Sequence, residues 1–65
     1  MKITYDPRSD TLSLQLKEGT VAESDENKPG IILDYDDDGD LMGIEILDAS
    51  TRVADPRTVQ FTAAA

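Results

Sequence analysis

Apolar and polar residues alternate along most of the chain, and this period of two predicts β-strands. In KITY the side chains of Ile3 and Tyr5 share one face, and TLSLQLK repeats the alternation with three leucines. The intervening DPRSD begins with Asp-Pro, in which the Asp side chain can accept the backbone N–H two residues on and proline fixes φ. The N-terminal segment is therefore predicted to form a β-hairpin.

The middle of the chain predicts three more strands. After a turn at Gly19, TVAES has the pattern of a third, weaker strand, and the polar DENKPG that follows it is typical of a loop. IILDY and LMGIEIL then carry apolar residues on both faces, which is typical of central strands that are covered on both sides.

The C-terminal part contains the one helix signal. DASTRVADP predicts a short helix near residues 49–54, which Asp48 or Ser50 can cap and the following proline stops. Residues 58–62 resume the alternation and predict a sixth strand.

These elements define a mainly β (α+β) fold, an antiparallel β-meander of five to six short strands with one short helix. The length allows one domain at most, which we expect to span residues 1–62 and to leave residues 63–65 as a frayed tail. The expected core draws on nearly every element: Ile3, Tyr5, Leu12, Leu14, Leu16, Val21, Ile32, Leu33, Ile44, Ile46, Val53 and Phe61.

The acidic stretch DYDDDGDLMGIE, residues 34–45, fits the calcium-loop pattern D-x-[DN]-x-[DN]-G-x5-E at every specified position. An EF-hand needs a helix on each side of this loop, but Pro29-Gly30 leaves about one helical turn before it. The neighbouring isoleucines also favour strands. A hairpin explains the same letters, since Asp37-Asp38-Gly39 suits a type I turn followed by a left-handed glycine. On extended strands Glu45 would lie too far from the tip to close a loop around a cation.

We therefore expect a hairpin tip and predict no metal site. Clustered carboxylates repel one another, and a divalent cation relieves that repulsion. Weak calcium binding at the hairpin 34–40, through Asp36, Asp38 and Asp40, is kept as a minor alternative. The segments YDPRSDTLSL and YDDDGDLMGI both read Tyr-Asp, a polar tip, Asp and an apolar strand, so we interpret them as two hairpins built alike.

Two further carboxylates are candidates for binding a partner protein. Asp34 and Glu45 lie among apolar residues on neighbouring strands, so they can face each other or a partner. The alternatives are that they point to solvent or pair with Arg52, Arg57 or Lys2. Together with Asp37 at the tip, they form our set of partner-binding candidates.

Composition narrows the ways in which so small a chain can be stabilised. A domain of 65 residues buries only about 60% of the surface of its unfolded chain and is marginal alone. The chain has no cysteine and no histidine, which excludes disulfides, thiolate zinc sites and the commonest general base. Oligomerisation, a partner protein or a hard cation on oxygen ligands remain as stabilisers.

The formal net charge of −8 restricts the possible partners. Acidic charge repels nucleic-acid phosphates and anionic membranes, whereas a basic protein is an electrostatically suitable partner. The charge also has a simpler interpretation, namely that it keeps a small protein soluble. The sequence shows no signal peptide and no apolar run that spans a bilayer, so we expect a cytoplasmic protein.

We expect no enzymatic activity and no catalytic residues. Hydroxyl side chains such as Ser50 are present, but no histidine can activate them. The acidic residues cluster at a predicted turn rather than in a cleft, and the chain is small for a substrate pocket of about 300 Å³. Glycine-rich phosphate loops are absent.

The runs MKITYDPRSDTLSLQL and PGIILDYDDDGDLMGIEILDAS resemble the family of small bacterial and archaeal proteins known as domain of unknown function 2283 (DUF 2283). The resemblance covers about residues 1–53 and implies a compact β-rich domain. Some members of the family occur beside small toxin-like proteins, which implies an antitoxin-like role.

Two functions from different classes follow as expectations. The first is binding of a basic protein partner, in an antitoxin-like manner, through an acidic face or an added edge strand. The second is a stand-alone structural or regulatory homo-oligomer, with a homodimer the commonest form, because two predicted strands are apolar on both faces. No cofactor, nucleic acid or membrane is expected as a partner.

Overall fold

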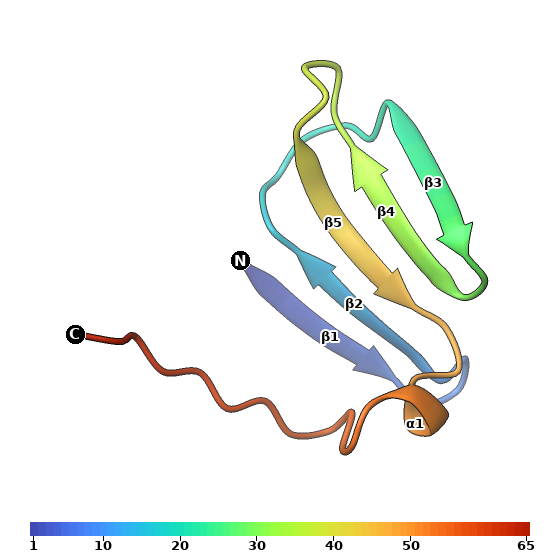
Figure 1. The fold of residues 1–65 in the computed structure, drawn as a ribbon, viewed down its shortest axis with the longest axis vertical. Coiled ribbons are helices and arrows are strands. Elements are labelled where there is room, and N and C mark those ends of the chain that lie inside the picture. Colours follow the sequence, from blue (N-terminus) through green and yellow to red (C-terminus); the bar gives the residue numbers. More distant parts are fainter.

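The computed structural model describes residues 1–65 and contains five strands and one short helix (Figure 1). The strands form one antiparallel sheet in the order β1-β2-β5-β4-β3, which confirms the predicted fold class. The elements in chain order are β1 (Lys2–Asp6), β2 (Thr11–Gln15), β3 (Glu23–Lys28), β4 (Ile31–Tyr35), β5 (Leu41–Ile46) and α1 (Ala49–Arg52).

The strand order differs from a simple meander, because β2 pairs with β5 and not with β3. The expected third strand at TVAES and loop at DENKPG were also misplaced, since β3 begins at Glu23 and includes the polar residues that follow. Every residue of β3 is exposed. A polar strand of this kind suits the edge of a sheet, where its side chains and outer backbone groups are in contact with water. The apolar β4 and β5 occupy inner positions.

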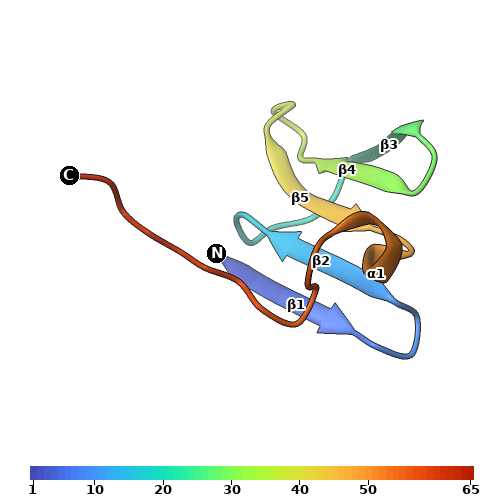
Figure 2. The same ribbon diagram turned by 60° about the horizontal axis from the view of Figure 1, so that its bottom comes forward.

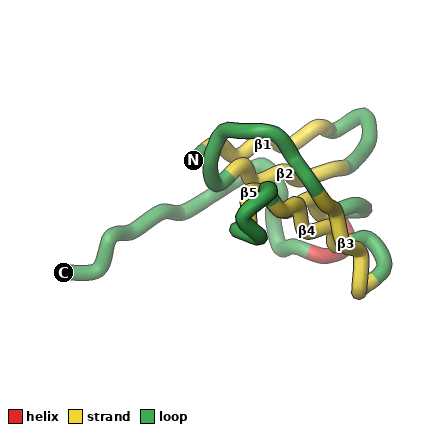
Figure 3. Tube along the Cα trace, turned by 90° about the horizontal axis from the view of Figure 1, so that it is seen from above, coloured by secondary structure: helices red, strands yellow, loops and turns green.

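The predicted sixth strand is absent, since residues 58–62 belong to no strand. The chain bends after α1, where the backbone N–H of Arg57 donates to the Asp55 carboxylate at 3.1 Å. The Arg57 guanidinium then lies over the Tyr5 ring, 5.5 Å from its centroid, so the backbone passes over β1 and does not run along its edge. The last residues extend away from the sheet (Figures 1 and 3).

The register of paired strands separates two faces of the sheet, because residues directly opposite each other point to the same side. One row contains Ile3, Leu14, Ile44 and Leu33, and the next contains Tyr5, Leu12, Ile46 and Ile31. We call the side that carries these eight residues the apolar face. The opposite side carries Ser13, Gln15, Asp34, Gly43 and Glu45, and we call it the polar face.

Few apolar side chains are fully buried, because the sheet is a single layer and α1 has only four residues. The buried ones are Leu12, Met42 and Ala49. Of the predicted core residues only Leu12 is among them. Ile3, Val21 and Phe61 are exposed, at 38%, 47% and 77%, and the other eight are half-buried. The prediction of a closed core was therefore wrong for those three residues.

Met42 escaped the sequence analysis because it lies at an irregularity in β5. The β4–β5 register slips between Asp34 and Tyr35, whose partners are Gly43 and Leu41. A bulge of this kind places two successive side chains on the same side of a sheet. Met42 therefore joins Gly43 on the polar face, where the β2–β3 loop covers it at Gly19.

The helix α1 lies at one end of the sheet (Figure 2) and is held by two turns. The Asp10 carboxylate accepts hydrogen bonds from the backbone N–H and the hydroxyl of Ser50, at 3.0 and 2.6 Å. At the other side, the Arg52 guanidinium donates to the carbonyl of Pro29 at 2.8 Å. Asp48 occupies the N-cap position, as one of the two predicted alternatives had it, but its side chain makes no cap hydrogen bond. The carboxylate that accepts a helix N–H is that of Asp10, from the β1–β2 turn.

Candidate functional site

The acidic tip between β4 and β5 is a closed hairpin turn. The Asp36 carboxylate accepts the backbone N–H groups of Asp38 and Asp40, each at 2.9 Å. The Gly39 N–H donates to the carbonyl of Asp36 at 3.0 Å, and Gly39 has a φ of 83°. Strands flank the turn on both sides, so the hairpin interpretation is confirmed and the EF-hand geometry is excluded.

The candidate cation ligands do lie together at this tip. One carboxylate oxygen from each of Asp36, Asp38 and Asp40 lies within 4.8 Å of the others. However, Oδ1 of Asp36 already accepts two backbone N–H groups, and its Oδ2 forms an ion pair with Lys17. The Lys17 ammonium is also 3.5 Å from Oδ2 of Asp40. The chain thus supplies its own positive charge where a cation would bind.

This ion pair shifts the pKa of both Lys17 and Asp36. The Lys17 hydrogen bond and the turn N–H groups lower the pKa of Asp36 below its ordinary value. In turn, the hydrogen bond to Asp36 raises the pKa of Lys17 despite some loss of hydration. Sequence reasoning missed Lys17, because it lies two residues beyond the end of β2, and only the pairing of β2 with β5 brings it to the tip.

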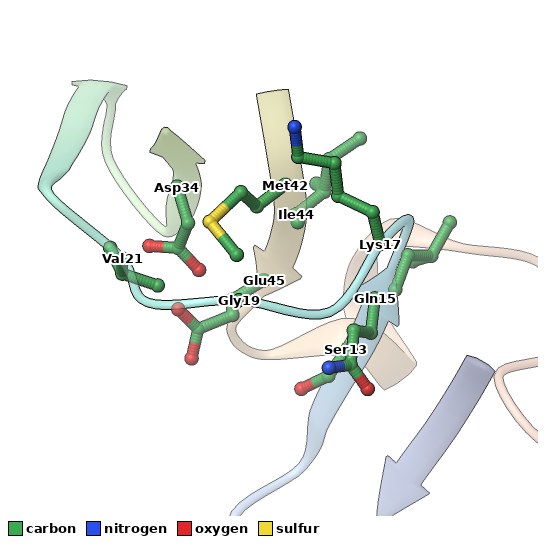
Figure 4. A pocket seen from close by; sticks show the side chains of 11 residues that line it. Ser13, Gln15, Lys17, Gly19, Val21, Asp34, Met42, Ile44 and Glu45 are labelled. Atoms are coloured by element: carbon green, nitrogen blue, oxygen red, sulfur yellow. The ribbon is translucent and has the colours of Figure 1, made fainter. Parts of the chain in front are cut away.

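Asp34 and Glu45 meet on the polar face, as Figure 4 shows. Asp34 also accepts a hydrogen bond from the Ser24 hydroxyl at 2.6 Å. Burial raises the pKa of Glu45 most, and the hydrogen bond and negative charge of Asp34 raise it further. Glu45 therefore holds its proton to a higher pH than an exposed glutamate does. The alternative that these carboxylates pair with Arg52 or Arg57 is not realised, because those side chains contact Pro29 and Tyr5.

A shallow hollow of about 260 Å³ opens beside this carboxyl pair. Its floor lies at Gly43, where an added Cβ would lie only 3.0 Å from the carbonyl oxygen of Leu14. Polar side chains of β2 and the β2–β3 loop residues Gly19 and Val21 form its walls (Figure 4). The volume is below the range of about 300 to 1,000 Å³ that is typical of small-molecule sites.

The charge of the molecule is divided sharply between two halves. Residues 23–45, which form β3, β4, β5 and the tip, contain nine acidic residues and one basic residue, a net charge of −8. The remaining residues contain five of each sign and are neutral. Because β3, β4 and β5 are neighbours in the sheet, these charges lie on one side of the molecule (Figure 1). We call residues 23–45 the acidic half and the rest of the chain the neutral half.

The candidate partner-binding residues all belong to the acidic half, but they lie at different places in it. Asp37 is exposed at the tip, whereas Asp34 and Glu45 are half-buried beside the hollow. The outer strand of this half, β3, is an open edge of the sheet whose residues are all exposed. An open edge offers unpaired backbone N–H and C=O groups to an incoming strand.

Together, these features define a small, single-layer antiparallel β-sheet protein with one acidic half. The model of the family described as protein of unknown function (DUF2283) matches residues 2–50. The chain therefore belongs to the DUF2283 family, which confirms the resemblance inferred from its motifs.

A relative with a sequence match is an uncharacterized protein of the archaeon Methanocaldococcus jannaschii. The two are 44% identical over 50 residues, which is 77% of this chain and 42% of the relative. The chain thus spans less than half the length of that protein. No solved structure matches the chain. None of its helices has the length and apolar character needed to cross a lipid bilayer.

Proposed function

We propose that the chain is a protein-interaction module that binds a basic partner protein through its acidic half. The observation that carries this proposal is the separation of charge, since the whole net charge of −8 falls on residues 23–45. A charge needed only for solubility has no reason to gather on one side. A concentrated negative field attracts a basic surface and speeds its association.

The strand β3 supplies the second part of the proposed interface. It is exposed along its length, and its outer edge is unpaired. A strand of the partner can add to this edge through backbone hydrogen bonds, and the acidic side chains then select for lysine and arginine. The hollow beside Asp34 and Glu45 has room for one basic side chain of the partner.

The antitoxin-like form of this function takes a small basic protein, such as an RNA-cleaving toxin, as the partner in the cytoplasm. An acidic surface that covers the basic groups of such a protein competes directly with RNA for them. The family description names no activity, so this form of the proposal rests on the charge and on the neighbouring toxin-like genes that the family resemblance implies.

The experiment is co-expression of the chain with the product of the neighbouring gene, followed by titration calorimetry across a salt series. We expect a complex whose affinity falls as salt rises, because screening weakens attraction between exposed charges. The double variant Glu23→Gln/Asp37→Asn should weaken binding by about tenfold. Neither side chain makes a hydrogen bond or ion pair within the chain, so the fold should persist.

The matched control is Glu18→Gln/Asp48→Asn in the neutral half. It removes the same two charges with the same chemical changes and should leave binding almost unchanged. Equal losses for the two double variants would mean that net charge alone matters, and affinity that is independent of salt would argue against an electrostatic interface.

A further inference from the structure

The sheet ends in two unlike edges, β1 and β3 (Figure 1). The β3 strand carries three acidic residues and one basic residue, and its pairing with β4 shifts register between Asp25 and Lys28. Like charge and irregular pairing are features that keep an edge from pairing with another copy of itself. The β1 strand has neither, since its five residues pair with β2 in unbroken register and contain one charge of each sign.

The outer side of β1 is open in the folded chain. No strand pairs with it, and the segment from Pro56 to Val59 lies over Ile3 and Tyr5 on the apolar face rather than beside them in the plane of the sheet. The outer backbone N–H and C=O groups of β1 are therefore free to pair with an added strand. Ile3 is one of the large apolar side chains that remain exposed.

The sequence of β1 is complementary to itself when a second copy runs antiparallel to it. A twofold axis at Thr4, perpendicular to the sheet, pairs all five residues of the strand. Lys2 then lies opposite Asp6 of the second copy, and Ile3 lies opposite its Tyr5. Because directly opposite residues point to the same side, both ion pairs form on the polar face and both apolar contacts form on the apolar face.

Other registers lose this complementarity. A slip by one residue places apolar side chains such as Ile3 opposite polar ones. A slip by two residues preserves the faces but separates the opposite charges. Both charged groups are also available, since Lys2 forms no ion pair within the chain. Asp6 accepts the Arg8 N–H through one carboxylate oxygen, which leaves the other oxygen free.

The distribution of charge over the whole molecule favours the same edge. The β1 strand belongs to the neutral half, so pairing through it joins the two neutral halves and leaves the two β3 strands roughly 40 Å apart at the ends of one continuous sheet. That separation is several times the screening length of about 8 Å at physiological salt. Pairing of β3 with β3 would bring acidic side chains together, and pairing of β1 with β3 would leave an open edge for further copies.

We propose that β1 is a self-association edge, at which two copies of the chain pair antiparallel about Thr4. A pairing of this length extends roughly 17 Å and is smaller than a standard interface of about 800 Å² per partner. We therefore expect a weak dimer, with a dissociation constant of roughly 10 μM to 1 mM. The proposed basic partner uses the β3 edge, the tip and the hollow, so the two proposals are independent and either can fail alone.

The first experiment measures the mass of the full chain by sedimentation equilibrium from micromolar to millimolar concentration. Lys2→Glu and Asp6→Lys each turn two ion pairs of the dimer into two like-charge pairs and should weaken it by tenfold or more. An equal mixture of these two variants should dimerise again, because every acidic side chain at the interface then lies opposite a basic one. The matched control Lys28→Glu makes the same change on the opposite edge and should leave the dimer unchanged.

A second experiment does not depend on the folding of Asp6→Lys. The chain has no cysteine, so Thr4→Cys introduces one thiol, which lies opposite its counterpart at the twofold axis. Mild oxidation should link most of this variant into a disulfide-bonded dimer, whereas the control Thr20→Cys, in the exposed β2–β3 loop, should remain mostly monomeric.

Four results would each overturn the proposal. They are a monomer at every concentration, assemblies larger than a dimer, equal effects of Lys2→Glu and Lys28→Glu, and equal cross-linking of the two cysteine variants. Circular dichroism of each variant confirms that it is folded. A mixture of folded Lys2→Glu and folded Asp6→Lys that stays monomeric would contradict the register about Thr4.

Discussion

The two hairpins of this protein begin with the same local chemistry and end with different roles. In the β1–β2 turn, Asp6 accepts the backbone N–H of Arg8 at 2.9 Å. In the β4–β5 turn, Asp36 accepts the N–H of Asp38, also two residues on and at 2.9 Å. The repeated Tyr-Asp motif therefore has the same local function in both hairpins, which is to fold the chain back on itself.

The aspartates that close the two turns differ. Asp10 accepts hydrogen bonds from the Tyr5 hydroxyl at 2.7 Å and from two groups of Ser50, so it joins the first hairpin to α1. Asp40 is exposed, and its only side-chain contact is with Lys17. The later chain brings a helix to the first turn and nothing to the second. The Asp10 carboxylate therefore attaches α1 to the first hairpin, whereas the Asp40 carboxylate remains an exposed negative charge at the second turn.

The largest expected effect distinguishes these two aspartates. Asp10→Ala leaves the Tyr5 hydroxyl and both Ser50 donors without their acceptor and weakens the attachment of α1, so the melting temperature should fall by about 10 °C or more. The matched change Asp40→Ala should lower it by roughly 3 °C at most. Thermal unfolding followed by circular dichroism measures both. Similar shifts for the two variants would remove the distinction between a structural and a free turn.

The next effect is the response to acid. The hydrogen bonds from Ser50 and Tyr5 hold the pKa of Asp10 below its usual value. Because the folded-state pKa is depressed, this stabilisation is present above the unfolded pKa of about 4 and is lost as pH falls through the folded value. The melting temperature of the parent should therefore drop more steeply below pH 4 than that of Asp10→Ala. Parallel curves would show that Asp10 is not a main source of acid sensitivity.

Local patterns predicted the hairpins well, because alternation and turn chemistry act over a few residues. They misplaced β3 and missed the β2–β5 pairing, since a polar edge strand has no apolar signature and neighbours in a sheet are not encoded locally. The tail alternates like a strand, but it passes over β1 and does not pair with the free edge of that strand. The site residues Asp34 and Glu45 were found from their apolar context. Lys17 contacts the tip, and Asp10 contacts Ser50, only through long-range pairing, so no local signal could identify these contacts.

The smallest effect concerns the strands below the second turn, where Glu45 meets Asp34. Burial and the adjacent Asp34 raise the pKa of Glu45, so its protonated form is the one that folding favours. Its contribution is complete below the unfolded pKa and is lost as pH rises through the folded value. Glu45→Gln, which mimics the protonated form, should therefore raise the melting temperature at pH 7 by roughly 1 to 3 °C and have no such effect at pH 3.

A carboxyl ¹³C titration by NMR should place the Glu45 midpoint above 4.5. Asp34→Asn should lower that midpoint only in part, because burial is the larger cause of the raised pKa. A Glu45 midpoint at or below its ordinary value would instead mean that Asp34 and Glu45 titrate as independent surface carboxyls. The strands of the second hairpin would then bring negative charge to the molecule but no interacting pair of carboxyl groups.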